Sequence, residues 1–104
     1  MLVRKSKYAE GDIITYKVVN GDECVAKFVK ETDHGFTINK PYVVIPSQGG
    51  LALMPALFTV SGNQDINVDF QHIMIHGETM PEMVSAYTER TTGIKQVPKS
   101  SIII

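Results

Sequence analysis

Apolar and polar residues alternate over much of the chain, a pattern typical of β-strands. The clearest stretch runs from Val18 to Pro46, where apolar runs are separated by short polar turns. This arrangement predicts two consecutive β-hairpins. The first turn contains Asn20-Gly21, and because both residues tolerate positive φ, we expect a two-residue type I′ turn there.

Five strands are expected in total, and the alternation assigns side chains to their faces. The expected strands are residues 13–19, 23–30, 36–45, 51–60 and 66–76. The core face of the first strand is assigned Ile14, Tyr16 and Val18. One face of the second strand is assigned Cys24, Ala26 and Phe28. Val25 and Val29 lie on the opposite face of the second strand. The small Ala26 would let the sheet bend sharply or let another strand approach closely.

Three of these strands carry signs of irregularity. Pro41 has no N–H to donate, so the third strand is expected to be bent, bulged or at an edge there. Pro55 interrupts the apolar run of residues 51–60, which we interpret as a bent or edge strand covered by another subunit. The alternation of residues 66–76 changes phase near Gln71-His72, which predicts a bulge.

One helix is expected after the strands. Thr79 is a candidate N-cap with Glu82 at the capping-box spacing, and the helix should run from Pro81 to Thr91 and stop at Gly93. The flanks are expected to be a flexible or loosely docked arm at residues 1–11 and a tail at residues 95–104. The basic residues of the arm are Arg4, Lys5 and Lys7. They indicate either a solvated terminus or a phosphate-binding arm. The three isoleucines at 102–104 should dock on a neighbour or form an added strand.

These elements predict a mainly β fold over residues 12–94, namely a small, strongly bent, five-stranded antiparallel barrel, SH3-like or OB-like, with one short C-terminal helix. The length of 104 residues fits one domain, and 43% hydrophobic and 20% charged residues are ordinary for a globular protein. A net charge of −1 does not indicate a strongly basic nucleic-acid binder, so such an activity would need a local basic patch or a ring of copies.

Composition also bears on the compartment. The single Cys24 leaves no internal disulfide framework, which favours a reducing cytoplasm. The first residues lack the apolar core of a secretory signal, and no apolar run is long enough to span a bilayer. We therefore expect a cytoplasmic protein with no membrane partner.

No group of residues indicates catalysis, a metal or a cofactor, so we do not expect an enzyme. His72 and His76 are four residues apart on a predicted strand, which separates them by roughly 13 Å, too far to chelate one ion. Cys24 has no motif that places a histidine beside it. The carboxylates of Asp65, Asp69 and Glu78 have no reason to converge.

Two short motifs carry a family resemblance. The segment VVNGDECVAKFVKETDHGFTINKP resembles the first motif of Sm-like proteins (Sm, Lsm and Hfq), and IMIHGETM resembles the second, in which a basic residue and Gly precede a short final strand. The matching residues are Val18, Asn20, Gly21, Ala26, Asp33, Phe36 and Ile38 in the first motif, and Ile73, Ile75, His76 and Gly77 in the second. The apolar segment GLALMPALF and the closing helix with Tyr87 are also similar to short Sm-like proteins common in tailed bacteriophages.

The resemblance implies a homo-oligomer joined through strand edges that binds single-stranded RNA. Bases would stack near Phe36 and be held by Thr37, Asn39 and His76-Gly77. The chain departs from the family in four places: the helix follows the barrel, Thr37 stands where Asn is usual, His76 stands where Arg is usual, and an apolar insert at residues 51–60 precedes the second motif. The alternative is therefore a phage-type structural or protein-interaction barrel that binds no nucleic acid, acting in the cytoplasm of an infected bacterium.

Overall fold

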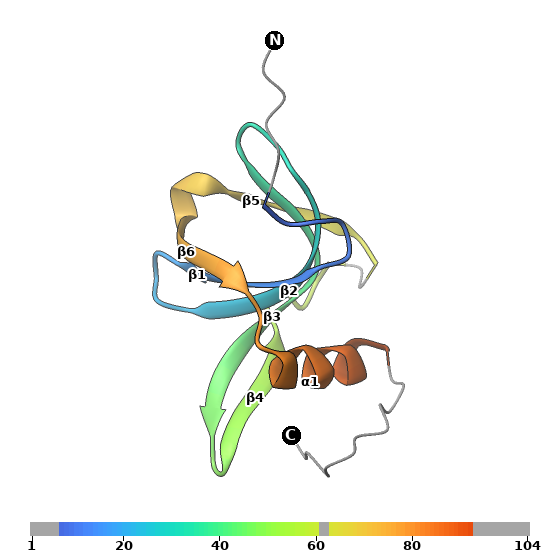
Figure 1. Ribbon diagram of the computed structural model, residues 1–104. Coiled ribbons are helices and arrows are strands. Elements are labelled where there is room, and N and C mark those ends of the chain that lie inside the picture. The colour runs from blue at the N-terminus through green and yellow to red at the C-terminus, as the bar shows by residue number, and fades with distance from the viewer. Residues whose placement is uncertain (1–6, 61–62, 93–104) are drawn as a thin grey trace.

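The computed structural model describes residues 7–60 and 63–92, which form one antiparallel sheet and one helix (Figure 1). The strands are β1 (Ile13–Val18), β2 (Glu23–Glu31), β3 (Gly35–Ser47), β4 (Gly50–Pro55), β5 (Asp65–Asp69) and β6 (Ile73–Glu78). A single 3-10 turn, η1 (Phe70–His72), joins β5 to β6, and α1 (Pro81–Thr92) follows. The mainly β class and the helix are confirmed, but the expected number of five strands is wrong because there are six.

The long strand β3 organises the sheet. The strand order is β4-β3-β2-β1-β6, and β5 also pairs with β3. On its outer side β3 pairs with β5 through residues 35–39 and with β4 through residues 42–47. Within the described residues β5 and β6 do not pair with each other, so hydrogen bonds do not close the sheet.

The junction between the two halves of β3 is a bulge at Lys40-Pro41. These two residues lie opposite Ala26 of β2, because Val25 pairs with Tyr42 and Lys27 with Asn39. Lys40 adopts a positive φ of 51°. The irregularity expected at Pro41 is therefore confirmed, and Ala26, with no exposed surface, lies at the bend as its small size suggested.

The β1–β2 hairpin is confirmed, but its turn differs from the expected type. A type I′ turn requires positive φ at both central residues. Of Asn20 and Gly21, only Gly21 has a positive φ, which is 99°. The N–H of Gly21 bonds to the carbonyl of Val18 at 2.8 Å, and that of Val18 bonds to the carbonyl of Asp22 at 3.0 Å. The loop is therefore a turn centred on Val19-Asn20, with the left-handed glycine after it.

Residues 66–76 do not form one bulged strand. The change of phase near Gln71-His72 marks η1, a corner at which the chain leaves β5 and starts β6. The Asp69 carboxylate accepts a hydrogen bond from the Gln71 N–H at 2.9 Å and so caps this turn.

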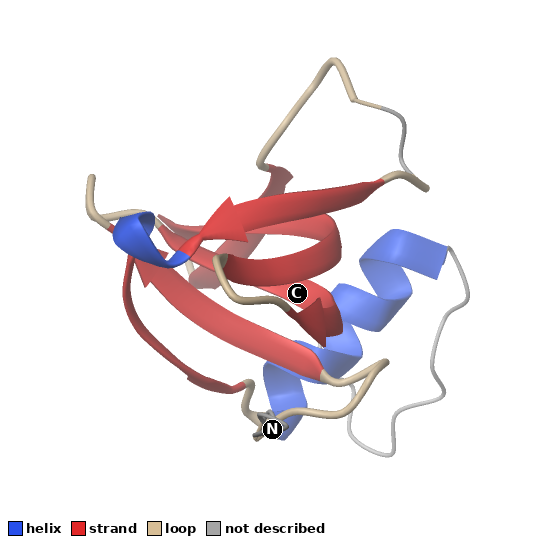
Figure 2. Ribbon diagram, turned by 90° about the horizontal axis from the view of Figure 1, so that it is seen from above, coloured by secondary structure: helices blue, strands red, loops and turns tan. Residues whose placement is uncertain are grey.

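Two apolar clusters lie on opposite faces of β2. Figure 2 shows the curled sheet with the helix α1 beside it. The first fills the inside of the curled sheet, and its buried members are Tyr8, Ile14, Tyr16, Cys24, Ala26, Phe28, Phe36 and Ile38. The second lies between the sheet and α1, and its buried members are Val25, Met83, Ala86 and Tyr87. The faces assigned to β1 and β2 from the sequence agree with this division. The Tyr87 hydroxyl ties α1 to the bulge by donating to the Lys40 carbonyl at 2.7 Å.

The helix begins as expected at Pro81, but Thr79 is not its N-cap. The Met80 carbonyl accepts the first helical hydrogen bond, from Val84 at 3.0 Å, so Met80 takes the cap position and Pro81 is the first helical residue. The Thr79 hydroxyl instead lies 2.7 Å from that of Thr15 on β1. Gly93, the expected helix stop, lies outside the described residues.

The N-terminal arm was expected to be flexible or loosely docked, and the part of it that the structure describes is docked on the sheet. Tyr8 is buried in the first core cluster, and the Gly11 N–H bonds to the Phe28 carbonyl at 2.8 Å. The basic residues at 4 and 5, and the tail at 95–104, lie outside the described residues. Among those that are described, no helix is both long enough and apolar enough to cross a membrane.

Candidate functional site

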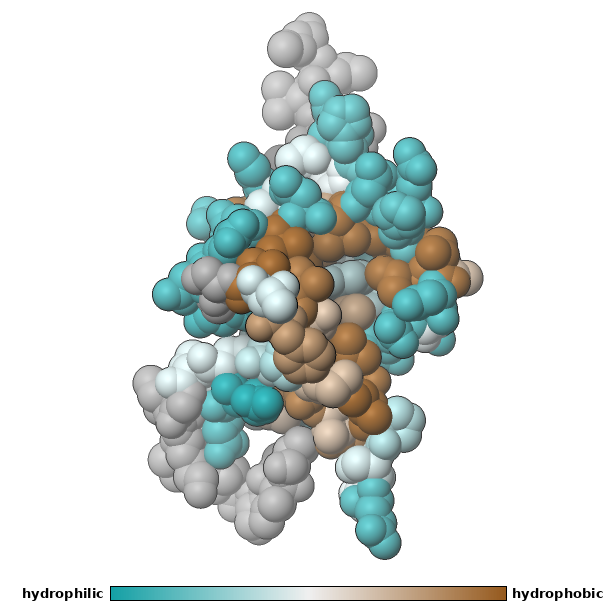
Figure 3. Space-filling model, turned by 180° about the vertical axis from the view of Figure 1, so that it is seen from behind, coloured by the Kyte–Doolittle hydropathy of each residue, from teal (hydrophilic) through white to brown (hydrophobic). Residues whose placement is uncertain are grey.

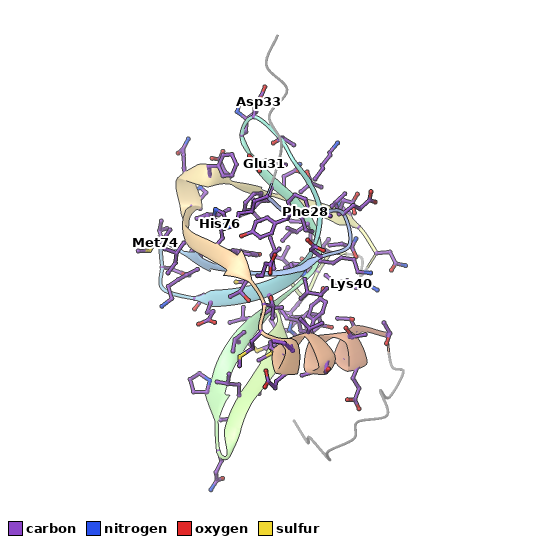
Figure 4. All side chains as sticks on the ribbon, in the orientation of Figure 1. Phe28, Glu31, Asp33, Lys40, Met74 and His76 are labelled. Carbon is purple, nitrogen blue, oxygen red and sulfur yellow. The ribbon has the colours of Figure 1, made fainter. Side chains whose placement is uncertain are left out.

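Phe36 and His76, both expected at the RNA site, come together in the structure. Their ring centroids lie 5.1 Å apart with perpendicular planes. Tyr8 packs on the same pair, at 5.9 Å from Phe36, and its hydroxyl lies 2.6 Å from the His76 Nδ1. Figure 4 shows the His76 ring on the inner side of the curled sheet, the same side as Phe28.

This aromatic group is closed to a stacking base. Phe36 is only 2% exposed, because Tyr8, Phe28, Phe70 and His76 surround its ring at centroid distances between 5.1 and 5.9 Å. A base could reach the Phe36 face only if one of these rings moved. His76, in contrast, is exposed.

Thr37 and Asn39 point to the opposite face of β3. The Thr37 hydroxyl donates to the Asn67 side-chain oxygen at 2.8 Å, and the Asn39 amide donates to the Asp65 carboxylate at 3.0 Å. These bonds follow from the register, in which Thr37 pairs with Asn67 and Asn39 with Asp65. The five residues expected at one site are therefore divided between two faces of the sheet.

His76-Gly77 does not lie in a turn before a short final strand. Both residues are inside β6, where His76 pairs with Tyr16 and Gly77 with Thr15. The corner that precedes the final strand is η1, whose sequence is Phe-Gln-His. This part of the second-motif resemblance is therefore corrected by the structure.

Gly77 lies in a shallow groove of about 300 Å³ between β1 and β6. The groove is lined by Thr15, Tyr16, Lys17, Glu23, Ile75, His76, Gly77 and Glu78. Its charged groups are one lysine and two carboxylates, so it offers no net positive charge to a phosphate.

Tyr8 is the residue of this site that sequence reasoning missed. Burial raises the pKa of its phenol, and the carboxylates of Glu78 and Glu31 raise it further. The phenol therefore stays protonated and can keep a hydrogen bond to His76. The signal in the sequence was weak: Tyr8 is the only aromatic residue before the first strand.

Cys24 is not arranged for catalysis. Burial raises the pKa of its thiol to about 11, with a further rise from the Asp22 carboxylate. The thiol is therefore protonated at neutral pH, whereas a nucleophilic cysteine needs a lowered pKa. Among the described residues, no group of three or more His, Cys, Asp or Glu side chains is placed to hold a metal ion.

Large apolar side chains remain exposed on β6. A register shift in its pairing with β1 leaves Met74 as an extra residue, because Val18 pairs with Ile73 and Lys17 with Ile75. As a result Met74 and Ile75 are 59% and 62% exposed. Figure 4 shows Met74 pointing away from the core.

A second apolar area covers the β3–β4 hairpin and the segment after it. Leu51, Met54, Leu57 and Phe58 are all exposed, Phe58 by 74%. Seen from behind, apolar residues gather over this hairpin (Figure 3). Exposed apolar groups of this kind are typical of interaction surfaces.

No protein-family model matches the sequence, and no curated protein is significantly similar to it.

Proposed function

We propose that the chain is a small barrel of the SH3-like or Sm-like type that acts as a self-assembling interaction module. In this view β1, β2, the first half of β3, β5 and β6 are the barrel strands, and η1 closes the curl through side-chain packing. Phe70 of η1 supports this, since its ring lies 5.2 Å from Phe36 of β3. The β3–β4 hairpin is then an extension that carries α1.

The open edge of β6 carries this proposal. Within the described residues β6 pairs with β1 alone, and it exposes Met74 and Ile75 side by side. An apolar strand with an unpaired edge favours pairing with another chain. The β5 strand pairs with β3 alone and offers a complementary edge. If β6 of one copy pairs with β5 of the next copy, the same contact repeats head to tail and produces a ring or a filament.

The test is the mass of the particle in solution. Native mass spectrometry and light scattering of the full chain should give an oligomer, and the M74K/I75K variant should give a monomer with an unchanged circular dichroism spectrum. Gln48→Lys, which adds a lysine at the distant β3–β4 turn, is the matched control and should keep the wild-type mass. A wild-type monomer at high micromolar concentration would refute the proposal.

Binding of single-stranded RNA by the same assembly is a second candidate function. It is supported by the polar face on which Thr37 and Asn39 lie beside Asn67, with Lys27 and Lys30 paired next to them on β2. Amide groups there can bond to base edges, and the lysines can contact phosphates. The Thr37 hydroxyl is buried and already donates to Asn67, so it would position Asn67 and not contact a base. The face holds Asp65 and Asp69 as well, which weakens its attraction for phosphates.

An RNA titration separates the two candidates. If RNA is bound, the affinity for uracil-rich or adenine-rich oligomers should fall linearly with salt on a logarithmic scale, and Asn39→Ala should weaken it. No binding at low salt, with the oligomer intact, would leave the structural or protein-interaction role as the better proposal.

A further inference from the structure

Among the described strands β4 pairs with β3 alone, so its outer edge carries backbone groups that face away from the sheet. Its register with β3 has no shift, and it continues to a hydrogen bond from the Ala56 N–H to the Pro41 carbonyl at 2.9 Å. Antiparallel bonds alternate along a strand, so the N–H groups of Ala52 and Met54 point to β3 and those of Leu51 and Leu53 point outward. Pro55 has no N–H.

A groove with both apolar and charged lining residues runs beside this edge, between β4 and the second half of α1. Its volume is about 420 Å³, and it is lined by Ala52, Leu53, Ala86, Glu89 and Arg90. A groove beside an open strand edge suits a strand that adds to the sheet, because backbone bonds hold the strand and the groove accepts its side chains.

Both faces of β4 are apolar, which restricts what can add to it. Leu51, Leu53 and Pro55 face the helix side, whereas Ala52 and Met54 face the other side. Leu51 is 45% exposed and Met54 39%. A strand beside β4 would bury side chains on both of its own faces, so it should be apolar at every position rather than at every second one.

The chain contains such a segment in Ile102–Ile104. Its three β-branched residues have high strand propensity. Ile102 lies ten positions after Thr92, the last described residue of α1, and an extended chain of that length reaches about 33–36 Å. The six residues of β4 span only about 20 Å, so the segment can return along the strand.

We propose that Ile102–Ile104 adds to the open edge of β4 as a further strand within the same molecule. Its side chains alternate between the groove beside α1 and the opposite face next to Met54. The last turn of α1 borders this groove, because Glu89 and Arg90 line it. The apolar run at Leu2-Val3 is a poorer occupant, since it precedes Tyr8, which is anchored in the other core cluster.

Amide hydrogen exchange at β4 tests the proposal residue by residue. In the full chain the Leu51 and Leu53 amides should exchange about tenfold or more slowly than in the I102D/I104D variant. Truncation after Thr92 should give the same acceleration. The Ala52 and Met54 amides, bonded to β3, should keep their rates in every variant and serve as internal references.

The matched control is L2D/V3D, which adds the same two charges to the other apolar run and should leave the Leu51 and Leu53 rates unchanged. The protection should also be independent of protein concentration. Three results would overturn the proposal: rates at Leu51 and Leu53 that are equally fast with and without the isoleucines, rates that are equally slow, or protection that appears only as concentration rises. The last result would assign the added strand to a second copy.

Discussion

The hydroxyl of Tyr8 lies 2.6 Å from the Nδ1 of His76, which joins the segment before β1 to the last strand of the sheet. The Tyr8 ring also packs at 5.5 Å from Phe28 and 5.9 Å from Phe36. One residue from outside the sheet therefore completes the first core cluster and covers Phe36. The described residues before β1 are therefore part of the folded unit.

Two substitutions of Tyr8 should destabilise the protein by different amounts. Tyr8→Ala removes a buried ring and should lower the free energy of unfolding by about 3–5 kcal/mol. Tyr8→Phe keeps the ring and removes the hydroxyl that bonds to His76, so it should cost about 0.5–1.5 kcal/mol. Urea denaturation followed by circular dichroism measures both values. An alanine variant as stable as the phenylalanine variant would contradict the burial of this ring.

Stability should fall in alkaline solution because of Cys24. The folded pKa of its thiol is about 11, raised by burial from an ordinary value of 9.0. Below pH 9 both states keep the proton, and the full stability is present. Between pH 9 and 11 the unfolded state ionises first, so the free energy of unfolding should drop by about 1.4 kcal/mol per pH unit.

The control for this pH effect is Cys24→Ala, which should show almost no decrease between pH 8.5 and 10. Above that range both proteins should lose stability, because burial also raises the pKa of the Tyr16 and Tyr87 phenols. Urea denaturation at a series of pH values tests the prediction. Parallel curves for the two proteins from pH 8.5 to 10 would show that the thiol is not responsible.

Local pattern was sufficient to predict the parts of the fold that depend on neighbouring residues. The two faces of β2 follow from alternation, and the bulge at Lys40-Pro41 follows from the missing N–H of proline. The edge position of β4 follows in the same way from Pro55. Each of these features depends on chemistry within a few residues, which is visible in one sequence.

Features that depend on distant contacts could not be predicted. The burial of Tyr8 requires a partner 68 positions away. The phase change at Gln71-His72 is compatible with a bulge or with a corner, and only the pairing of β5 with β3 and of β6 with β1 decides for the corner. The division of the candidate site, in contrast, follows from local alternation that the sequence already shows: Phe36 and Thr37 are adjacent in a strand and so point to opposite faces.

Gly35 should tolerate no side chain. A Cβ at this position would lie 1.9 Å from the Val68 carbonyl oxygen, which is backbone and cannot turn aside. Gly35→Ala must therefore separate β3 from β5, and we expect a loss of about 3 kcal/mol in the free energy of unfolding. Gly77→Ala is the matched control, because that glycine also lies in a strand but has nothing within 4 Å of the added Cβ. Equal stability of the two variants would show that β5 does not approach β3 this closely.

Gly21 tests the turn between β1 and β2 through backbone strain alone. Its φ is 99°, and a Cβ built there has nothing within 4 Å, so any cost arises from conformation and not from a clash. Gly21→Val should lower the free energy of unfolding by about 2 kcal/mol, since β-branched residues strongly disfavour positive φ. Gly21→Asn is the informative control: asparagine adopts the left-handed region more readily, so its loss should be about half that of valine or less. Thermal melts of the two variants give the comparison. Equal losses for the valine and asparagine variants would show that the backbone at position 21 adopts a conformation other than the one with positive φ.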